Sequence, residues 1–174
     1  MASKPVLVFF TALLPTCHLK GKTSIHESGI TVGTRKLVGE TLLIFHTDCD
    51  EGRKSLRMTT SGIKICDYLV FYTKDDDIAE VVCYLELKGS GLKDASKQVL
   101  ETHQRTIAVL KEKSRKEQYQ HVSWKVCICL HGQASRSSRH IQDELIQTFG
   151  KSNICIKHGI TKFDIGEILR KNTR

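Results

Sequence analysis

The chain lacks the sequence features of several common protein classes. Aromatic residues make up only 6% of it and form no stripe, which disfavours a surface that stacks single-stranded bases. None of the eight histidines stands in an H-E-x-x-H motif, which disfavours a zinc hydrolase. Cys127 and Cys129 form a C-x-C pair without a second pair at zinc-finger spacing, so a structural zinc cluster is not expected.

Long apolar runs are also missing. The run at residues 6–14 is too short to cross a bilayer. With Lys4 before it, this run imitates a signal peptide, but Pro5 opens it and no A-x-A cleavage site follows. We interpret it as a buried strand or an apolar arm and expect no membrane partner. Export is the alternative, which an N-terminal mass measurement would decide.

The composition fits one basic globular domain. With 174 residues, 40% of them hydrophobic, the chain is long enough for one core, so residues 1–174 are predicted to form a single domain. The 27 Lys and Arg against 19 Asp and Glu give a net charge of +8, which favours polyanions such as nucleic acid. Several of the seven cysteines lie inside apolar runs, where thiols behave as small hydrophobes, and this indicates a reducing, cytoplasmic location.

The spacing of the apolar residues predicts an α/β fold. Alternation predicts strands, and a recurrence every three to four residues predicts helices. The expected elements are a strand or helix segment at 41–46, a turn-rich connector at 48–55, two strands within 57–72 separated by a bend at Ser61 and Gly62, a third strand at 78–89, a long helix within 89–118, a strand at 121–132 with Trp124, Val126, Ile128 and Leu130 on one face, a helix ending at Gly150, a strand at 153–159 and a short helix near the C-terminus. The three strands within 57–89 should form an antiparallel meander, and the fold as a whole should be a mixed sheet flanked by helices.

Glu86 and Lys88 lie two positions apart in the third of these strands, so both side chains point from one face. Val82 and Tyr84 share that face, whereas the residues between them form an uncharged, apolar face. Burying an unpaired charge is costly. The face that carries Glu86 is therefore expected to be exposed to solvent, to pair its charged side chains with one another, or to hold a ligand.

Asp67 is the acidic residue that the preceding strand brings close to Glu86. If residues 74–77 form a four-residue turn, Thr73 lies opposite Ile78 and Asp67 lies opposite Tyr84. Asp67 is then the diagonal neighbour of Glu86, close enough for both carboxylates to bind one ion.

Two carboxylates suit a hard cation such as Mg²⁺, which keeps several of its waters. The backbone carbonyl of Leu87 is a further candidate ligand. Lys88 could orient an attacking water or offset the negative charge that develops at a phosphate.

Three stretches carry these residues: CDYLVFY, then CYLELKG, then the helical DASKQVLETHQRT. Asp at the start of one strand, E-x-K on the next strand and A-x-x-Q on the following helix form the pattern of the PD-(D/E)xK nuclease superfamily. The segment 63–106 resembles that superfamily. One departure is Cys66, which stands where the motif has proline.

This resemblance implies a restriction-endonuclease-like fold, in which a mixed β-sheet is flanked by helices. It implies an endonuclease that hydrolyses phosphodiester bonds with Mg²⁺, and Mn²⁺ is expected to substitute. Carried over to this chain, the metal ligands are Asp67 and Glu86, the catalytic lysine is Lys88, and Gln98 is an auxiliary polar residue. DNA is favoured over RNA as the substrate, in phage defence or DNA processing.

Many members of the superfamily also place a glutamate on an upstream helix. Glu27 and Glu40 are the candidates in this chain, and we favour Glu27.

Simpler interpretations stay open. The three charged residues could form a solvated cross-strand ion pair, and Gln98 could be a surface amide. Basic residues within 111–116 and 136–139 could contact phosphates or belong to an ordinary charged surface. The chain could also be a non-catalytic nucleic-acid or protein binding subunit of a defence complex, alone, as a homodimer or with a partner subunit.

Overall fold

The computed structural model describes residues 5–75, 80–89, 91–113, 118–132 and 139–171. Their helices and strands, in chain order, are α1 (Pro5–Leu13), β1 (Ser24–Glu27), β2 (Ile30–Gly33), β3 (Glu40–His46), α2 (Asp50–Ser55), β4 (Tyr68–Lys74), β5 (Glu80–Lys88), α3 (Leu92–Lys113), β6 (Val122–Leu130), α4 (Arg139–Phe149), the 3-10 helix η2 (Lys151–Asn153), β7 (Ile154–His158), β8 (Lys162–Asp164) and α5 (Gly166–Leu169).

A five-stranded mixed sheet forms the centre of the fold, with strand order β3-β4-β5-β6-β7. β3, β4 and β5 pair antiparallel, which confirms the predicted pairing of the strand that ends near Tyr72 with the strand at 78–89. The first strand of the observed meander is β3 and not the predicted strand just after Leu56. Helix α3 follows β5 and makes the crossover that lets β6 run parallel to β5, and β7 runs parallel to β6. The predicted α/β class, with a mixed sheet flanked by helices, is therefore confirmed.

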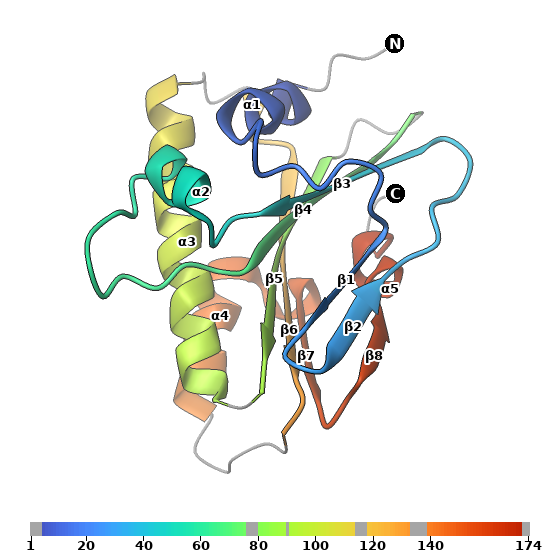
Figure 1. Cartoon of the computed structure of the whole chain (residues 1–174), viewed down its shortest axis with the longest axis vertical. Coiled ribbons are helices and arrows are strands. Elements are labelled where there is room, and N and C mark those ends of the chain that lie inside the picture. The colour runs from blue at the N-terminus through green and yellow to red at the C-terminus, as the bar shows by residue number, and fades with distance from the viewer. Residues whose placement is uncertain (1–4, 76–79, 90, 114–117, 133–138, 172–174) are drawn as a thin grey trace.

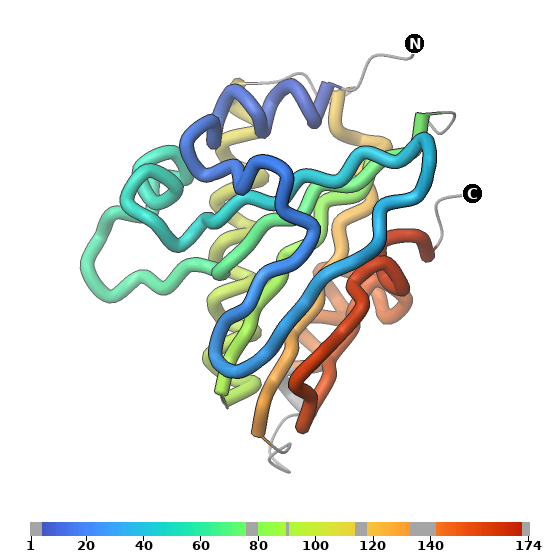
Figure 2. Tube along the Cα trace, turned by 45° about the vertical axis from the view of Figure 1, so that its right-hand side comes forward, coloured from blue at the N-terminus to red at the C-terminus, as the bar shows by residue number. Residues whose placement is uncertain are grey.

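Each face of this sheet is covered by a different layer (Figure 1). Helices α3 and α4 lie against one face, and α1 packs at one end of the same side. The opposite face carries α5 and a small second sheet of strand order β1-β2-β8. Figure 2 shows the β1–β2 hairpin crossing in front of the central strands.

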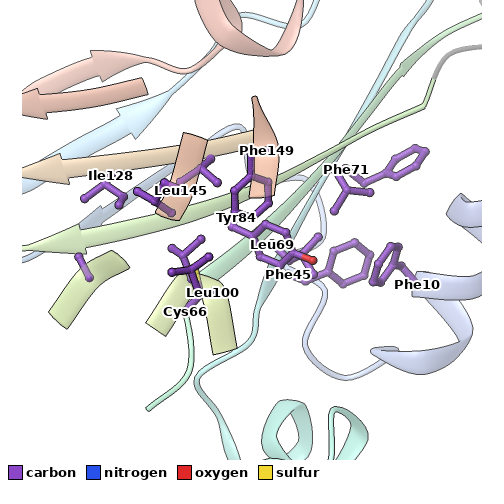
Figure 3. Close-up of a cluster of buried hydrophobic side chains, with 14 of the residues drawn as sticks. Phe10, Phe45, Cys66, Leu69, Phe71, Tyr84, Leu100, Ile128, Leu145 and Phe149 are labelled. Carbon is purple, nitrogen blue, oxygen red and sulfur yellow. The ribbon is translucent and has the colours of Figure 1, made fainter. Parts of the chain in front are cut away.

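Tyr84 on β5 lies in the middle of the core on the helix side (Figure 3). Its ring stacks on Trp124, with 6.1 Å between centroids, and meets Phe149 of α4 edge-on at 6.0 Å. Phe45 and Phe10 extend the same cluster to α1. This packing fixes β5 between two layers.

β5 is consequently buried on both faces, whereas only one face was expected to belong to the core. Val82 and Tyr84, on the face of Glu86, belong to the core under the helices, and Cys83 and Leu85 belong to the core under the small sheet. A strand in the middle of a sheet that is covered on both sides has a nearly continuous apolar sequence. The paired or ligand-holding surface is therefore restricted to the carboxyl end of the strand.

The N-terminal apolar run forms helix α1 and not the strand or arm that we expected. Pro5 occupies the first turn, where its missing N–H and fixed φ suit a helix start. The buried carboxylate of Glu80 accepts a hydrogen bond from the Leu7 N–H at 3.1 Å. Among the helices in the described ranges, none is long and apolar enough to cross a membrane.

Three further segments differ from the sequence prediction. The connector at 48–55 contains helix α2, and residues 57–67 contain no strand, so β4 begins only at Tyr68. The polar segment before residue 40, for which the sequence predicted no element, contains the β1–β2 hairpin, whose turn residues Ser28 and Gly29 have φ of 52° and 77°. Positive φ at both positions is the geometry of a two-residue type I′ turn.

Candidate active site

Asp67 and Glu86, called the carboxylate pair below, lie where β4 begins and β5 nears its end. The strands pair Tyr68 with Leu85, so the same register places Asp67 directly opposite Glu86. The expected register, with Asp67 opposite Tyr84, is wrong by two residues. Because side chains alternate with a period of two, this shift leaves Asp67 on the predicted face.

The turn causes this difference. Thr73 pairs with Glu80 and not with Ile78, which lies outside the described residues. The connection between the two strands is therefore longer than the four-residue turn that the prediction assumed.

Reciprocal hydrogen bonds hold the carboxylate pair in place. The Leu87 N–H donates to Asp67 Oδ2 at 2.8 Å, and the Asp67 N–H donates to Glu86 Oε2 at 3.1 Å. Each carboxylate is thus anchored to the neighbouring strand through one oxygen. The second oxygen of each, Asp67 Oδ1 and Glu86 Oε1, is left for another interaction.

Lys88 lies beside the second oxygen of Glu86. Its Nζ is 3.2 Å from Glu86 Oε1, and 25% of the Lys88 side chain is exposed, against none of Glu86. Glu86 Oε1 is buried and has no hydrogen-bond partner among the described residues, so its contact with Lys88 is an ion pair without hydrogen-bond alignment. A buried carboxylate oxygen whose contact in the described residues is a single ion pair is costly, and a bound cation would reduce that cost.

Burial dominates the electrostatics of the pair. It raises the pKa of the Glu86 carboxyl to about 8, and the negative charge of Asp67 contributes to this rise, while Lys88 opposes it. Burial also raises the pKa of the Asp67 carboxyl to about 7, although the Leu87 amide opposes this rise. Without a cation, the pair therefore holds protons that ordinary carboxyl groups release well below neutral pH.

Two acidic residues outside the predicted motif also act on Asp67. The charges of Glu27 and Asp48 both contribute to its raised pKa. Glu27 ends β1, and its hydrogen bond with the Tyr68 hydroxyl contributes to raising the pKa of that tyrosine, after burial. The favoured upstream glutamate thus reaches the pair from a strand and not from a helix.

Asp48 was missed because it stands in a turn-rich, polar segment where acidic residues are common. In the structure it follows β3 and forms an ion pair with Arg53, with 2.6 Å between Arg53 Nη2 and Asp48 Oδ1. Only the pairing of β3 with β4 brings this segment beside Asp67.

Glu40, the second upstream candidate, lies far from the carboxylate pair. It begins β3 and pairs with Lys74, at the opposite end of β4 from Asp67. The Arg170 side chain is the largest cause of the fall in the Glu40 pKa to about 2, and the Tyr72 hydroxyl donates to Glu40 at 2.8 Å. Glu40 therefore belongs to a structural ion pair.

Helix α3 fixes the backbone just before Asp67. Gln98 Nε2 donates to the Ile65 carbonyl at 2.8 Å, and the Cys66 N–H donates to Thr102 Oγ1 at 2.9 Å. Gln98 is 4% exposed, so it is not a surface amide, and its buried Oε1 has no hydrogen-bond partner within the described ranges. Gln98 thus orients the segment that carries Asp67.

The site supplies fewer metal ligands than a complete protein cage. Across the described residues, no three or more His, Cys, Asp or Glu side chains are grouped for metal binding. The Leu87 N–H points to Asp67, and the N–H and C=O of a strand residue face the same neighbour, so the Leu87 carbonyl is directed to the same side. Two carboxylates with one carbonyl fit Mg²⁺, which commonly takes one or two carboxylates and keeps several waters.

Comparisons with protein-family models, curated proteins and solved structures found no match. The function of the site is therefore argued from its own geometry.

The raised pKa values predict a pH-dependent stability for the metal-free protein. Between about pH 4 and pH 8 the folded chain holds more protons on the carboxylate pair than the unfolded chain does, so the pair makes stability fall as pH rises. Between pH 5 and pH 8 the free energy of unfolding of Asp67→Asn should therefore fall by less than that of wild type, with a difference on the order of 2 kcal/mol. Urea unfolding of both proteins across this range, without divalent cations, measures the difference.

Burial lowers the pKa of His103 to about 4, and this group makes stability rise with pH between about pH 4 and pH 6.5. The effect of the carboxylate pair is therefore read from the difference between wild type and variant. Parallel pH profiles for the two proteins would contradict the prediction.

Proposed function

We propose that this protein is a metal-dependent nuclease that hydrolyses phosphodiester bonds, with DNA favoured over RNA. The observation that carries this proposal is the carboxylate pair, in which each side chain is anchored through one oxygen and keeps the other available beside Lys88. Further support comes from the order of the elements, since an antiparallel meander, a helix and a parallel strand agree with the restriction-endonuclease-like fold that the motif implies.

Each residue has a role that its position allows. Asp67 and Glu86 would hold a divalent cation, together with the Leu87 carbonyl. When bound, such a cation polarises the scissile phosphate and favours attack by water. Lys88 places a positive charge at the partly exposed edge of the site, where it can orient the attacking water and stabilise charge that develops on phosphate oxygens.

The net charge of +8 supports a polyanionic substrate. The predicted phosphate-contacting stretches at 111–116 and 136–139 lie largely outside the described residues, so they add no structural support.

A nucleic-acid binding subunit without turnover is the second candidate. The observation that favours it is the burial of the pair: Glu86 is 0% exposed and Asp67 is 7% exposed. Cleavage requires a phosphate to reach the carboxylates, whereas binding of nucleic acid through the excess of basic residues does not.

One assay separates the two candidates. The purified full-length chain is incubated with supercoiled plasmid, single-stranded DNA and RNA, in Mg²⁺, in Mn²⁺ and in excess chelator. We expect cleavage with either cation, preferentially of DNA, and none in chelator or with Asp67→Asn. Binding of the same substrates without cleavage under every condition would reject the nuclease and favour the binding subunit.

A further inference from the structure

Cys17 and Cys49 bring two thiols together from distant parts of the chain. Their sulfur atoms are 3.3 Å apart, although the residues are 32 positions apart in sequence. All seven cysteines are free in this structure, and the sulfur atoms of Cys127 and Cys129 are 3.7 Å apart. A disulfide needs about 2.05 Å between sulfurs, so Cys17 and Cys49 would have to approach by only about 1.3 Å.

Both partners are held in this relation by the surrounding backbone. Cys17 follows α1, and its carbonyl accepts a hydrogen bond from the His46 N–H at 2.8 Å. Cys49 is the N-cap of α2: its sulfur accepts from the Gly52 N–H at 3.3 Å and donates to the His46 carbonyl at 3.3 Å. Because the Cys49 S–H donates to the His46 carbonyl, the Cys49 sulfur can accept a hydrogen bond from the Cys17 S–H.

Access to solvent separates this pair from Cys127 and Cys129. Cys49 is partly exposed, and Cys17 lies behind it at 3% exposure. Cys127 and Cys129 are both completely buried inside the sheet. A soluble oxidant can therefore reach one thiol of the first pair and neither thiol of the second.

We propose that Cys17 and Cys49 form a reversible oxidation site, which closes to a disulfide with a peroxide as the oxidant. The Cys49 thiolate attacks hydrogen peroxide, breaks its O–O bond and becomes a sulfenic acid, while the hydroxide released takes a proton and leaves as water. Cys17 then loses its proton and attacks the sulfenic sulfur, which forms the S–S bond and releases a second water. Two thiols and one peroxide thus give one disulfide and two waters.

The disulfide would tie the segment after α1 to the start of α2, beside the candidate active site. Cys49 follows Asp48, whose charge acts on Asp67, and Thr47 donates its N–H to the Asp67 carbonyl at 2.9 Å. Closing a loop of this length restricts the unfolded chain. The oxidised protein should therefore have a higher Tm, and this holds whether or not the carboxylate pair catalyses cleavage.

The test treats the reduced full-length chain with hydrogen peroxide and maps its peptides without reduction. We expect a linked pair of peptides containing Cys17 and Cys49, lighter by two hydrogens than the separate peptides and separated again by dithiothreitol. The Tm should rise by about 5 °C on oxidation. Cys49→Ser should lose both the linkage and the shift, and Cys155→Ser, which removes another partly exposed thiol, should keep both.

Cys155 provides the competing outcome. A hydrogen bond from Cys127 is the main cause that lowers the pKa of Cys155 to about 7, which favours the thiolate form that reacts with peroxide. A linkage of Cys155 to Cys127 in place of the proposed one would overturn the proposal. The proposal would also be overturned if Cys17 and Cys49 stayed free, and could still be alkylated, at a peroxide concentration that fully oxidises Cys155. Both results come from wild-type protein, so they do not depend on a variant that folds.

Discussion

Lys88→Ala should reduce the Mg²⁺-dependent cleavage that we propose by at least about 100-fold, because it removes the positive charge that the proposal places beside the scissile phosphate. The substitution also leaves the buried Glu86 without its ion-pair partner, whose Nζ lies at 3.2 Å. Since a quarter of the Lys88 side chain is exposed, water can replace part of that interaction, and the loss of stability should stay near 1 kcal/mol. Cleavage rates and urea unfolding of the same preparation measure both effects.

Lys162→Ala is the matched control. Lys162 is an exposed lysine on β8, in the small sheet on the other face of the molecule, so its replacement should leave the cleavage rate within about twofold of wild type. Lys88→Arg keeps the charge and should retain more activity than Lys88→Ala. Cleavage by Lys88→Ala at the wild-type rate would remove the lysine from the mechanism, even if cleavage stays metal-dependent.

Gly52→Ala should destabilise the protein by about 3 kcal/mol, although alanine is normally the better helix residue by about 1 kcal/mol. Gly52 is buried in α2, and a Cβ atom there would overlap the Thr47 carbonyl oxygen. Thr47 also donates through its side chain to the Cys66 carbonyl at 2.5 Å, so a displaced Thr47 disturbs the backbone next to Asp67. Thermal unfolding should show a Tm lower by about 5–10 °C.

Gly89→Ala is the control for this experiment. No atom of the described residues lies within 4 Å of a Cβ atom built at Gly89, and the φ of Gly89 is not in the left-handed region. Its Tm should remain within about 2 °C of wild type. Equal Tm values for the two variants would show that α2 can move away from Thr47 without cost.

The sequence specified the pair β4–β5 and the long helix well, because their residues follow a clear period, but it placed the first strand of the meander after Leu56 and not at β3. Val99, Thr102 and Thr106 recur at helical spacing, and all three are buried in α3. The face shared by Asp67 and Glu86 was also predictable, since a period of two survives an error of two in the register. The register itself was not, because it depends on the length of the turn between the strands.

Other features depend on contacts between distant segments, which one sequence does not reveal. The apolar run of α1 has no amphipathic pattern, and its helix is fixed by packing and by the Glu80 carboxylate. Lys125 alternates with apolar residues on β6, a pattern typical of a solvated lysine. Its side chain is completely buried, and its ammonium donates to the Ile168 carbonyl of α5 at 2.7 Å. Asp48 was likewise hidden until β3 paired with β4.

The two layers that enclose β5 also control how fast its backbone amides exchange hydrogen with the solvent. Water reaches the amides of Val82 and Tyr84 only when a whole covering layer detaches, so their exchange follows the global opening of the protein. The Leu87 amide differs, since it is bonded to the Asp67 carboxylate and not to a carbonyl of the adjacent strand. Its exchange rate is coupled to the position of that one side chain, and this makes it a local spectroscopic reporter inside an otherwise slow-exchanging strand.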